Sequence, residues 1–360
     1  MTRFEAISEQ MRRQWARLAG RGRVQLMEIC GTHTVAVSRG GLRSLFPEEL
    51  RLVSGPGCPV CVTDQAYIDR AVHLAASAPD VTIATYGDMI RVPGRYGSLE
   101  TARSAGADVR VVYAAHEAVA LARRLPGRQV VFLAIGFETT TPATALAVRQ
   151  ARREKVPNFL VLTAHKLVLP AMRALLAGGD VPIDGFLCPG HVSVITGWRV
   201  YEPIAGEFHV PCVVAGFDDV QILAGIAEIL RQLADDAPAA VSVYPAVKPE
   251  GNPTARRIVE EVFQVADASW RALGVIPDSG LELREEYAGL DAARRFDLPE
   301  MESYELPGCR CGEVITGRCL PTECPLFANA CTPRTPIGPC MVSSEGSCAA
   351  YYKYHWRPRG

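Results

Sequence analysis

The chain has 360 residues, of which 48% are hydrophobic, and it carries 38 basic and 39 acidic side chains. This length supplies apolar surface for at least one sizeable core and predicts two or three domains. A net charge of −1 provides no basic field for nucleic acid or an anionic membrane, so we expect proteins or small molecules as partners.

The first twenty residues are polar and charged, with Arg3, Glu5, Glu9 and Arg12 among them, and they lack the apolar core of a signal peptide. No later stretch reaches the roughly 18 uninterrupted apolar residues of a membrane span. We therefore expect a cytoplasmic protein without membrane contact. Because a reducing cytosol does not normally maintain structural disulfides, the twelve cysteines predict metal binding or thiol chemistry.

Short β-branched runs alternate with amphipathic helical stretches over residues 24–233, which is typical of parallel α/β sheets. The eight predicted strands lie at residues 24–29, 50–55, 81–87, 109–114, 130–136, 159–165, 185–190 and 212–217. The predicted crossover helices, which space their apolar residues by three and four, are Gln65–Ser77, His116–Leu125, Ala143–Glu154 and Asp219–Leu233. Eight strands predict two sheets, in two α/β domains that face a cleft.

Most predicted strands end in a small polar or thiol-bearing turn. Examples are residues 30–33, 55–58, 136–138, 163–165 and 188–191. In parallel α/β sheets, ligands bind beyond the carboxyl ends of the strands, so we expect the functional site where these turns gather. Cys188 and Cys212 are associated with strands, and we expect Cys188 to face the cleft.

The regular pattern weakens at a proline-rich joint formed by Pro245, Pro249 and Pro253. Thr254–Leu273 follows as a predicted long helix, with Pro253 just before its first turn. From Pro277 onward the apolar periodicity largely disappears. We therefore assign residues 1–150 and 151–275 to two α/β domains, and residues 276–360 to an irregular, partly helical module that needs a cross-link for order.

Seven of the cysteines fall in this C-terminal module: Cys309, Cys311, Cys319, Cys324, Cys331, Cys340 and Cys348. Thiolates presented from loops beside prolines suit an iron-sulfur cluster, which takes four of them. A structural zinc site is the alternative, but such sites commonly use CxxC pairs, and this tail contains none. The three remaining thiols either form a redox pair beside the cluster or act as small buried apolar residues. Spacing alone does not select the ligands.

Cys58 and Cys61 form a CxxC motif between a predicted strand and a predicted helix that contains Asp64 to Ser77. The dipole and free N–H groups at a helix start stabilise a thiolate. This pair can therefore close a disulfide or bind a metal.

Cys30 and His33 follow another predicted strand, and a thiolate beside an imidazole makes a partial iron site. The same residues also suit a cysteine hydrolase, in which Cys30 is the nucleophile and His33, His165 or His191 is the base. A single histidine, however, is more often a hydrogen-bonded structural residue. A nucleotide-binding enzyme has little support, because the chain lacks a P-loop and a clear GxGxxG motif.

Five strings in order carry a specific resemblance: MEICGTHT at 27–34, SGPGCPVCVT at 54–63, GFETTTP at 136–142, CPGH at 188–191, and a tail that runs from CRCGEV through TECPLF and CTP to GPCMVSSEGSCAAYYKY. Together they resemble the HypD family of nickel-iron hydrogenase maturation proteins, and the match extends over essentially the whole chain. The resemblance implies two α/β domains plus a cluster-bearing C-terminal region, in agreement with the sequence pattern.

The resemblance also implies a function. Proteins of this family pair with HypC to hold an iron ion while carbonyl and cyanide ligands are added, and the cyanide comes from HypE. By resemblance, Cys30 is the iron ligand, His33 lies near it, and Cys58 and Cys61 are a redox pair. Such a protein assembles a metal cofactor with the help of thiol redox chemistry and is not a conventional turnover enzyme.

In the tail, the resemblance assigns four cysteines as ligands of a 4Fe-4S cluster: Cys309, Cys324, Cys331 and Cys348. It assigns a redox disulfide to Cys311 and Cys340, and Cys319 remains as a surplus thiol. The arrangement resembles ferredoxin:thioredoxin reductase, in which a cluster passes electrons to a neighbouring disulfide, and it implies electron supply through the cluster and the thiol pairs. A cluster-dependent protein disulfide reductase is the alternative function.

Overall fold

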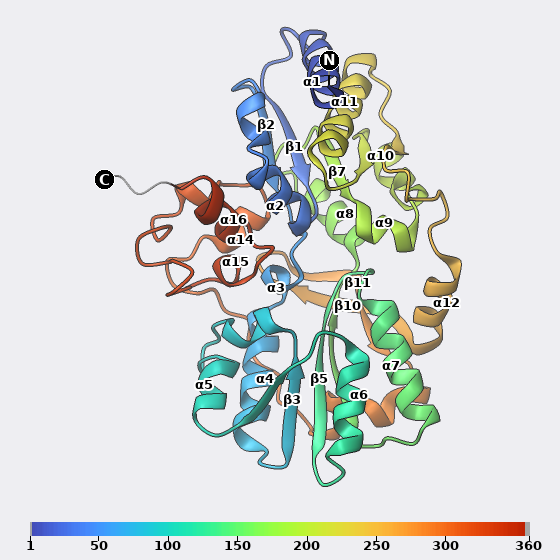
Figure 1. Cartoon of the computed structure of the whole chain (residues 1–360), viewed down its shortest axis with the longest axis vertical. Helices are drawn as coiled ribbons and strands as arrows, with labels where there is room; N and C mark the ends of the chain where they lie inside the picture. The colour runs from blue at the N-terminus through green and yellow to red at the C-terminus, as the bar shows by residue number, and fades with distance from the viewer. Residues whose placement is uncertain (1, 357–360) are drawn as a thin grey trace.

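Two parallel sheets organise the computed structural model, which describes residues 2–356. One sheet has five strands in the order β2-β1-β7-β8-β9, and the other has four strands in the order β4-β3-β5-β6. The strand pairs in both sheets are parallel. Figure 1 shows the sheets as an upper and a lower lobe, with the C-terminal segment beside their junction. The predicted α/β class with two parallel sheets is confirmed.

All eight predicted strands form, and apart from the edge strand β4 their residues are largely apolar and buried within the sheets. The five-stranded sheet contains β1 (Val24–Glu28), β2 (Leu50–Ser54), β7 (Gly185–Pro189), β8 (Cys212–Ala215) and β9 (Ala240–Ser242). The four-stranded sheet contains β3 (Val81–Thr85), β4 (Asp108–Val111), β5 (Gln129–Gly136) and β6 (Phe159–His165). The short strand β9 was not predicted, since three residues show no clear period.

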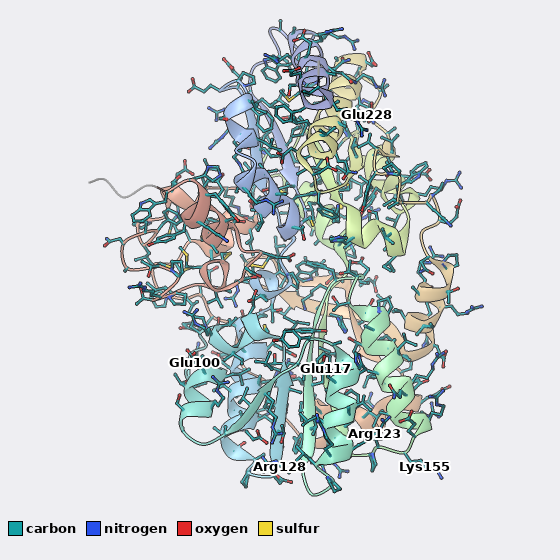
Figure 2. The ribbon with its side chains drawn as sticks, in the orientation of Figure 1. Glu100, Glu117, Arg123, Arg128, Lys155 and Glu228 are labelled. Atoms are coloured by element: carbon teal, nitrogen blue, oxygen red, sulfur yellow. A yellow bond between two sulfur atoms is a disulfide. The ribbon has the colours of Figure 1, made fainter. Side chains whose placement is uncertain are left out.

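The predicted crossover helices are confirmed as α4 (Gln65–Ser77), α6 (Ala115–Arg124), α7 (Thr141–Arg153) and α11 (Asp219–Asp235). The remaining helices of the sheet lobes are α1 (Arg3–Ala16), α2 (Gly31–Arg39), α3 (Pro59–Val62), α5 (Leu99–Ser104), α8 (Val168–Gly178), α9 (Gly190–Thr196), α10 (Glu202–Phe208), α12 (Pro253–Val262) and α13 (Ala292–Arg295). Figure 2 shows charged side chains such as Glu100, Arg123 and Lys155 on the outside of the lower lobe. Within residues 2–356, none of the helices has the length and apolar character needed to cross a bilayer.

The strands are not divided between the two sheets at residue 150, as the sequence predicted. β1 pairs with β7 in a register that places Leu26 opposite Gly185, so the amino-terminal strands share a sheet with residues 185–242. β6 joins β5 in the other sheet. The chain therefore enters the lower lobe after β2 and returns to the upper lobe after β6. Hydrophobic periodicity locates strands but does not reveal their neighbours.

The long helix predicted over Thr254–Leu273 is wrong in its second half. α12 ends at Val262, after a first turn that is capped by the side chain of Asn252. The next residues form β10 (Phe263–Trp270), which pairs antiparallel with β11 (Gly274–Leu283). Phe263, Val265 and Trp270 are of residue types that favour strands, and pairing with β11 completes the hairpin.

The carboxyl ends of the two sheets meet around α3, which is a single helical turn. β2 leads into α3, and the chain then continues into α4 of the lower lobe (Figure 1). From the other side, Phe137 follows β5 and packs against Trp270 at the end of β10, with 6.0 Å between the ring centroids. α3 and the β10–β11 hairpin thus pack between the sheets, where the sequence predicted a cleft.

Residues 299–356 form the C-terminal module, which contains the short helices α14 (Cys311–Ile315), α15 (Pro339–Val342) and α16 (Ser347–Tyr354). Asp88 in the lower lobe accepts hydrogen bonds from the backbone N–H and hydroxyl of Ser344, at 2.8 and 2.9 Å. In the upper lobe, the hydroxyl of Thr32 donates to Glu345 at 2.7 Å. The module is therefore attached to both lobes.

A buried ion pair also supports the module. Arg43 Nη2 donates to Glu28 Oε1 at 2.9 Å, and Glu28 has no exposed side-chain surface. The same guanidinium donates to the carbonyl oxygen of Leu52 at 3.4 Å and lies 5.0 Å from the ring centroid of Tyr351 in α16. Arg43 therefore connects the start of the five-stranded sheet to the last helix.

We expect Arg43→Ala to lower the free energy of unfolding by about 3–5 kcal/mol, because it leaves the buried Glu28 carboxylate without a counter-charge and with the Ser54 hydroxyl as its hydrogen-bond donor. The matched control is Arg199→Ala, which removes the exposed pair with Glu250 and is expected to cost less than about 1 kcal/mol. Urea unfolding of the two anaerobic proteins measures both changes. Equal losses in the two variants would contradict the proposed role of Arg43.

Candidate functional site

Cys30 lies just beyond β1 and is the N-cap residue of α2. It is 8% exposed, and burial raises the pKa of its thiol to about 12. Without a metal, the thiol is therefore protonated at neutral pH. A metal ion that bound there would displace this proton and stabilise the thiolate.

His33 lies in the first turn of α2 and is fully buried. Its Nε2 atom is 2.9 Å from the carbonyl oxygen of Gly216, and burial lowers the pKa of the imidazole to about 4. A neutral ring that donates through Nε2 carries a lone pair on Nδ1, and Nδ1 has no hydrogen-bond partner within residues 2–356. The structure thus places a thiol and a neutral imidazole in the same helical turn.

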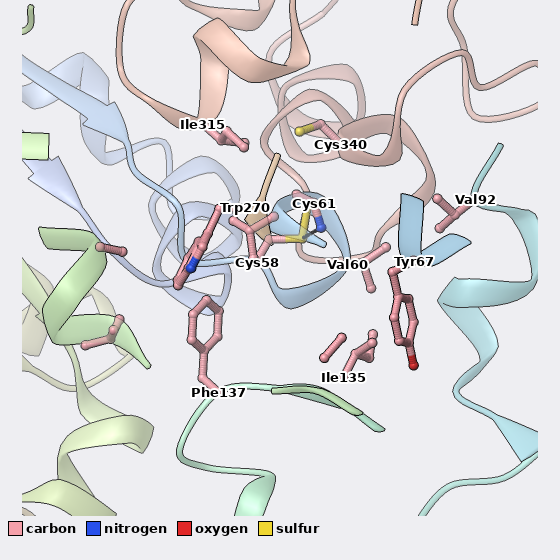
Figure 3. Close-up of a cluster of buried hydrophobic side chains, with 14 of the residues drawn as sticks. Cys58, Val60, Cys61, Tyr67, Val92, Ile135, Phe137, Trp270, Ile315 and Cys340 are labelled. Atoms are coloured by element: carbon pink, nitrogen blue, oxygen red, sulfur yellow. Dashed lines mark hydrogen bonds between the residues drawn. A yellow bond between two sulfur atoms is a disulfide. The ribbon is translucent and has the colours of Figure 1, made fainter. Parts of the chain in front are cut away.

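Cys58 and Cys61 form a disulfide across α3, with their Cα atoms 5.2 Å apart. Cys58 is the N-cap of α3, and its sulfur accepts a hydrogen bond from the backbone N–H of Cys61 at 3.1 Å. The predicted placement of this pair on the helix of Asp64–Ser77 is corrected, since Asp64 caps the separate helix α4. Figure 3 shows the pair beside Trp270, with Cys340 of the C-terminal module close by.

The turn before Cys58 packs directly against Cys30. The backbone N–H of Gly31 donates to the carbonyl oxygen of Gly57 at 3.2 Å. A Cβ atom on Gly57 would lie within 2.5 Å of backbone atoms of Cys30, so only glycine permits this close approach. The two predicted amino-terminal thiol motifs therefore belong to one site.

Four thiols of the C-terminal module line a single small cavity: Cys309, Cys324, Cys331 and Cys348. Burial, together with the nearby thiols of Cys331 and Cys324, raises the pKa of Cys309 to about 11. Burial likewise raises the pKa of Cys348, and the thiol of Cys309 adds to this increase. The shared cavity thus brings the four thiols together.

The same four residues are suited to hold an iron-sulfur cluster. Leu326, Phe327 and Met341 supply an apolar wall, and the backbone N–H of Ile337 donates to the sulfur of Cys331 at 3.4 Å. Apolar surroundings and N–H donors to sulfur are features that tune such clusters. The four thiols, the apolar wall and the backbone donor therefore fit the 4Fe-4S cluster that the resemblance implies. Across residues 2–356, no group of three or more His, Cys, Asp or Glu side chains has an arrangement that could hold a single metal ion.

Cys319 does not line this cavity, although burial raises its pKa to about 11. Cys311 and Cys340 do contribute to the cavity wall, and they are joined by a disulfide with Cα atoms 6.1 Å apart. α14 and α15, which carry this disulfide, both pack against α3. The second disulfide thus lies between the four-cysteine cavity and the Cys58–Cys61 pair.

The other two predicted histidine bases, His165 and His191, make no hydrogen bond to Cys30 within residues 2–356. His165 ends β6 in the lower lobe, where its Nδ1 atom is 3.4 Å from the carbonyl oxygen of Gly136. His191 is exposed and stacks on Phe217, with ring centroids 4.0 Å apart. Cys188 has no exposed surface, so the expectation that it faces a cleft is wrong.

Sequence reasoning missed two polar residues at the site. Glu345 reaches Thr32 beside Cys30, and a Cβ atom on Gly31 would lie 2.6 Å from the Glu345 Cβ. Glu345 lies in the string SSEGSC, part of the tail that carries the family resemblance, so the sequence offered a reason to consider it as a site residue. Arg271 donates to the carbonyl oxygen of Cys61 at 3.0 Å, but it fell inside the incorrectly predicted helix and gave no signal.

These features define a two-lobed α/β protein with a thiol centre at the lobe junction and an adjoining cysteine-rich module suited to a metal cluster. The chain belongs to the HypD family. The family model described as "Hydrogenase formation hypA family" matches residues 3–355, so the match covers both lobes and the module.

Named relatives agree with this assignment. The chain is 46% identical to the hydrogenase maturation factor HypD of Cupriavidus necator over 92% of its own length and 90% of that protein. It is 45% identical to the protein of the same name from Escherichia coli, over 92% and 89% of the two chains. A putative hydrogenase expression/formation protein of Methanocaldococcus jannaschii is 43% identical over 92% of both chains.

Proposed function

We propose that the protein is a hydrogenase maturation factor that, together with HypC, holds iron at Cys30 while an Fe(CN)2CO group is assembled with cyanide from HypE. The observation that carries the proposal is the meeting of three elements at one point. The Cys30 turn, the Cys58–Cys61 disulfide and Glu345 of the C-terminal module all lie at the lobe junction. We place the protein in the cytoplasm, where reducing conditions keep metal-binding thiols available.

Iron is the cargo in this proposal, and Cys30 supplies a soft anionic ligand for it. Cyanide and carbonyl are strong ligands that favour low-spin iron, which leaves thiolates from Cys30 and from HypC to hold the ion. Loss of the Cys30 proton accompanies iron binding. His33 stays neutral at physiological pH because burial lowers its pKa to about 4, so its Nδ1 lone pair can accept a hydrogen bond in the turn that carries Cys30.

Cys309, Cys324, Cys331 and Cys348 are the residues that would hold a 4Fe-4S cluster. When bound, such a cluster supplies one-electron redox chemistry at a potential set by its surroundings. The apolar wall and the N–H donor to Cys331 are the means by which this chain would exclude water and tune that potential.

The two disulfides allow electrons to pass from one cysteine pair to the other by thiol–disulfide exchange. If Cys311 and Cys340 are reduced, a thiolate of that pair can attack the Cys58–Cys61 disulfide and form a mixed disulfide. The second thiol of the attacking pair then closes the Cys311–Cys340 bond and releases Cys58 and Cys61 as a dithiol. Two electrons pass in this exchange, and the packing of α14 and α15 on α3 supports it.

A cluster-dependent protein disulfide reductase is the second candidate, because it would use the same cavity and the same two disulfides. The cysteine hydrolase has less support. Its nucleophile needs a thiolate beside a base, whereas burial raises the pKa of Cys30 to about 12 and the Nε2 atom of His33 is bound to Gly216.

Metal analysis of the anaerobically purified complex with HypC separates these functions. The scaffold is expected to contain about five iron atoms per chain, four in the cluster and one as cargo, with infrared bands from cyanide and carbonyl. A disulfide reductase would contain about four and show no such bands. Zinc in place of iron would support the structural-zinc alternative for the tail.

We expect Cys58 and Cys61 to cycle between disulfide and dithiol while the C-terminal cysteines keep their metal. Cys58 caps a helical turn, where N–H groups stabilise a thiolate. Alkylation followed by mass spectrometry should find the pair oxidised in air and reduced by a mild dithiol. The buried thiol Cys212 is the internal control, because it should give the same result in both conditions. A pair that is alkylated equally in air and in dithiol would exclude the redox role.

A further inference from the structure

Arg271 connects the β10–β11 hairpin to α3 through four hydrogen bonds. Its backbone N–H donates to the carbonyl oxygen of Val62 at 2.9 Å. Its side chain donates to the carbonyl oxygens of Cys61 and Thr63, at 3.0 and 2.9 Å, and to Gln65 Oε1 at 3.0 Å. Because the last carbonyl groups of a helix lack partners within the helix, Arg271 completes the end of the turn that carries the CxxC motif.

The guanidinium of Arg271 is a buried charge with neutral partners. The residue is 7% exposed, and within residues 2–356 no carboxylate lies at salt-bridge distance from it. Asp64, the nearest acidic residue in sequence to the α3 turn, is occupied by the backbone N–H of Ala66 at 2.7 Å and by the hydroxyl of Ser269. The carboxylates of Asp64, Glu305 and Asp69 act on this charge only from beyond ion-pair distance. A buried cation without a direct ion pair is costly, so a further negative charge that forms nearby is favoured.

Residues of both thiol centres lie against Arg271. The guanidinium contacts the backbone of Cys61 directly. It also lines a small cavity together with Cys309 and Cys311 of the C-terminal module. Arg271 therefore stands between the Cys58–Cys61 pair and the second disulfide, on the path along which the proposed thiol exchange would occur.

We propose that Arg271 is a positioning residue that favours the reduced, dithiol form of the Cys58–Cys61 pair by placing its positive charge beside the thiolate of that pair. This inference rests on the redox role proposed above. The disulfide is neutral and gains nothing from the cation, whereas the reduced pair can carry a thiolate, which the cation stabilises. Stabilising the reduced form raises the reduction potential of a disulfide.

The redox step balances with a dithiol such as dithiothreitol as the reductant. The Cys58–Cys61 bond breaks and the reagent closes its own disulfide, so two electrons pass to the protein. The reagent also gives up two protons. One of them protonates one cysteine of the pair, and the other goes to solvent when the second cysteine remains a thiolate beside Arg271.

The test compares equilibrium constants for reduction of Cys58–Cys61 in the full-length anaerobic protein. Wild type and variants are equilibrated with mixtures of reduced and oxidised dithiothreitol, alkylated, digested and analysed by mass spectrometry. We expect Arg271→Gln to lower the constant about ten-fold, which corresponds to ~30 mV. Arg271→Lys keeps the positive charge, so its constant should remain within about three-fold of the wild-type constant. A three-fold change corresponds to only about half of the free energy of a ten-fold change.

Gln65→Glu tests the same charge while Arg271 stays in place. The new carboxylate would occupy the position of Gln65 Oε1, 3.0 Å from Nη1, and would neutralise the guanidinium. It should lower the constant in the same direction as Arg271→Gln, and it keeps the inference testable if that variant does not fold. The control is Arg128→Gln, at the far end of the lower lobe (Figure 2), where Arg128 donates to the carbonyl oxygen of Val81 at 2.7 Å. This variant should leave the constant unchanged.

The outcomes separate the redox role of Cys58–Cys61 from the effect of Arg271 on that pair. A wild-type pair that never equilibrates with the dithiol overturns the redox role, and the inference with it. A wild-type pair that equilibrates while Arg271→Gln and Gln65→Glu keep the wild-type constant overturns the inference alone. An Arg271→Lys variant that shifts as far as Arg271→Gln, or an Arg128→Gln variant that shifts at all, also overturns it. Lowered constants in Arg271→Gln and Gln65→Glu, with Arg271→Lys and Arg128→Gln near wild type, support it.

Discussion

Replacing Cys30 with serine is expected to abolish the iron held with HypC while the C-terminal cluster stays in place. The serine hydroxyl remains protonated at neutral pH and is a poor ligand for low-spin iron. The fold should tolerate the change, because Cys30 is the N-cap of α2 and serine is a favoured N-cap residue. Iron in the anaerobic complex should fall by about one atom per chain, and the cyanide and carbonyl bands should disappear.

Cells that contain only the Cys30→Ser variant should have hydrogenase activity at background level. Cys319→Ser is the matched control, since it also removes a thiol but one that lies outside both the cavity and the junction. Normal cyanide and carbonyl bands from Cys30→Ser would show that iron is held elsewhere, with Cys58 and Cys61 as the next candidates.

Alanine at any one of four positions in the C-terminal module should bleach the visible absorption of the anaerobic protein. These positions are Cys309, Cys324, Cys331 and Cys348. Each variant should lose up to about four iron atoms per chain, because a cubane needs all four thiolates. The module should also become less stable, since part of the binding energy of a metal centre contributes to folding. Iron analysis and limited proteolysis measure the two effects.

Cys319→Ala is expected to retain full colour, because this thiol does not line the four-cysteine cavity. The comparison with Cys309→Ala is the sharpest form of the test, since both cysteines lie in the same module. A bleached Cys319→Ala beside a coloured Cys309→Ala would show that the assigned ligand set is wrong.

Hydrophobic pattern was sufficient to predict every strand of the two sheets except the three-residue β9, because buried parallel strands are short β-branched runs that end in recognisable turns. The turns at Cys30 and Cys58 could be predicted as one site, since the carboxyl ends of parallel strands share an edge. Their direct contact depends on Gly57, whose missing side chain lets the two turns touch.

The parts that could not be predicted depend on long-range pairing. Residues 263–270 were predicted as the second half of a helix, whereas they pair with β11 as a strand. Arg271 acquires its contacts with α3 through that hairpin. Glu345 meets Thr32 across more than three hundred residues of sequence, a distance over which no local period carries information.

The upper sheet combines strands from the start of the chain with strands made much later, and this affects how the chain folds during synthesis on the ribosome. β1 and β2 are made first and can pair with each other, but β1 meets its other neighbour only when Gly185 and the rest of β7 have emerged. The four strands of the lower sheet, at residues 81–165, are all complete before then. Contacts between distant residues form slowly, and nascent chains expose such unpaired edges. The Cys30 turn therefore lacks its β7 neighbour until all four strands of the lower sheet have been made.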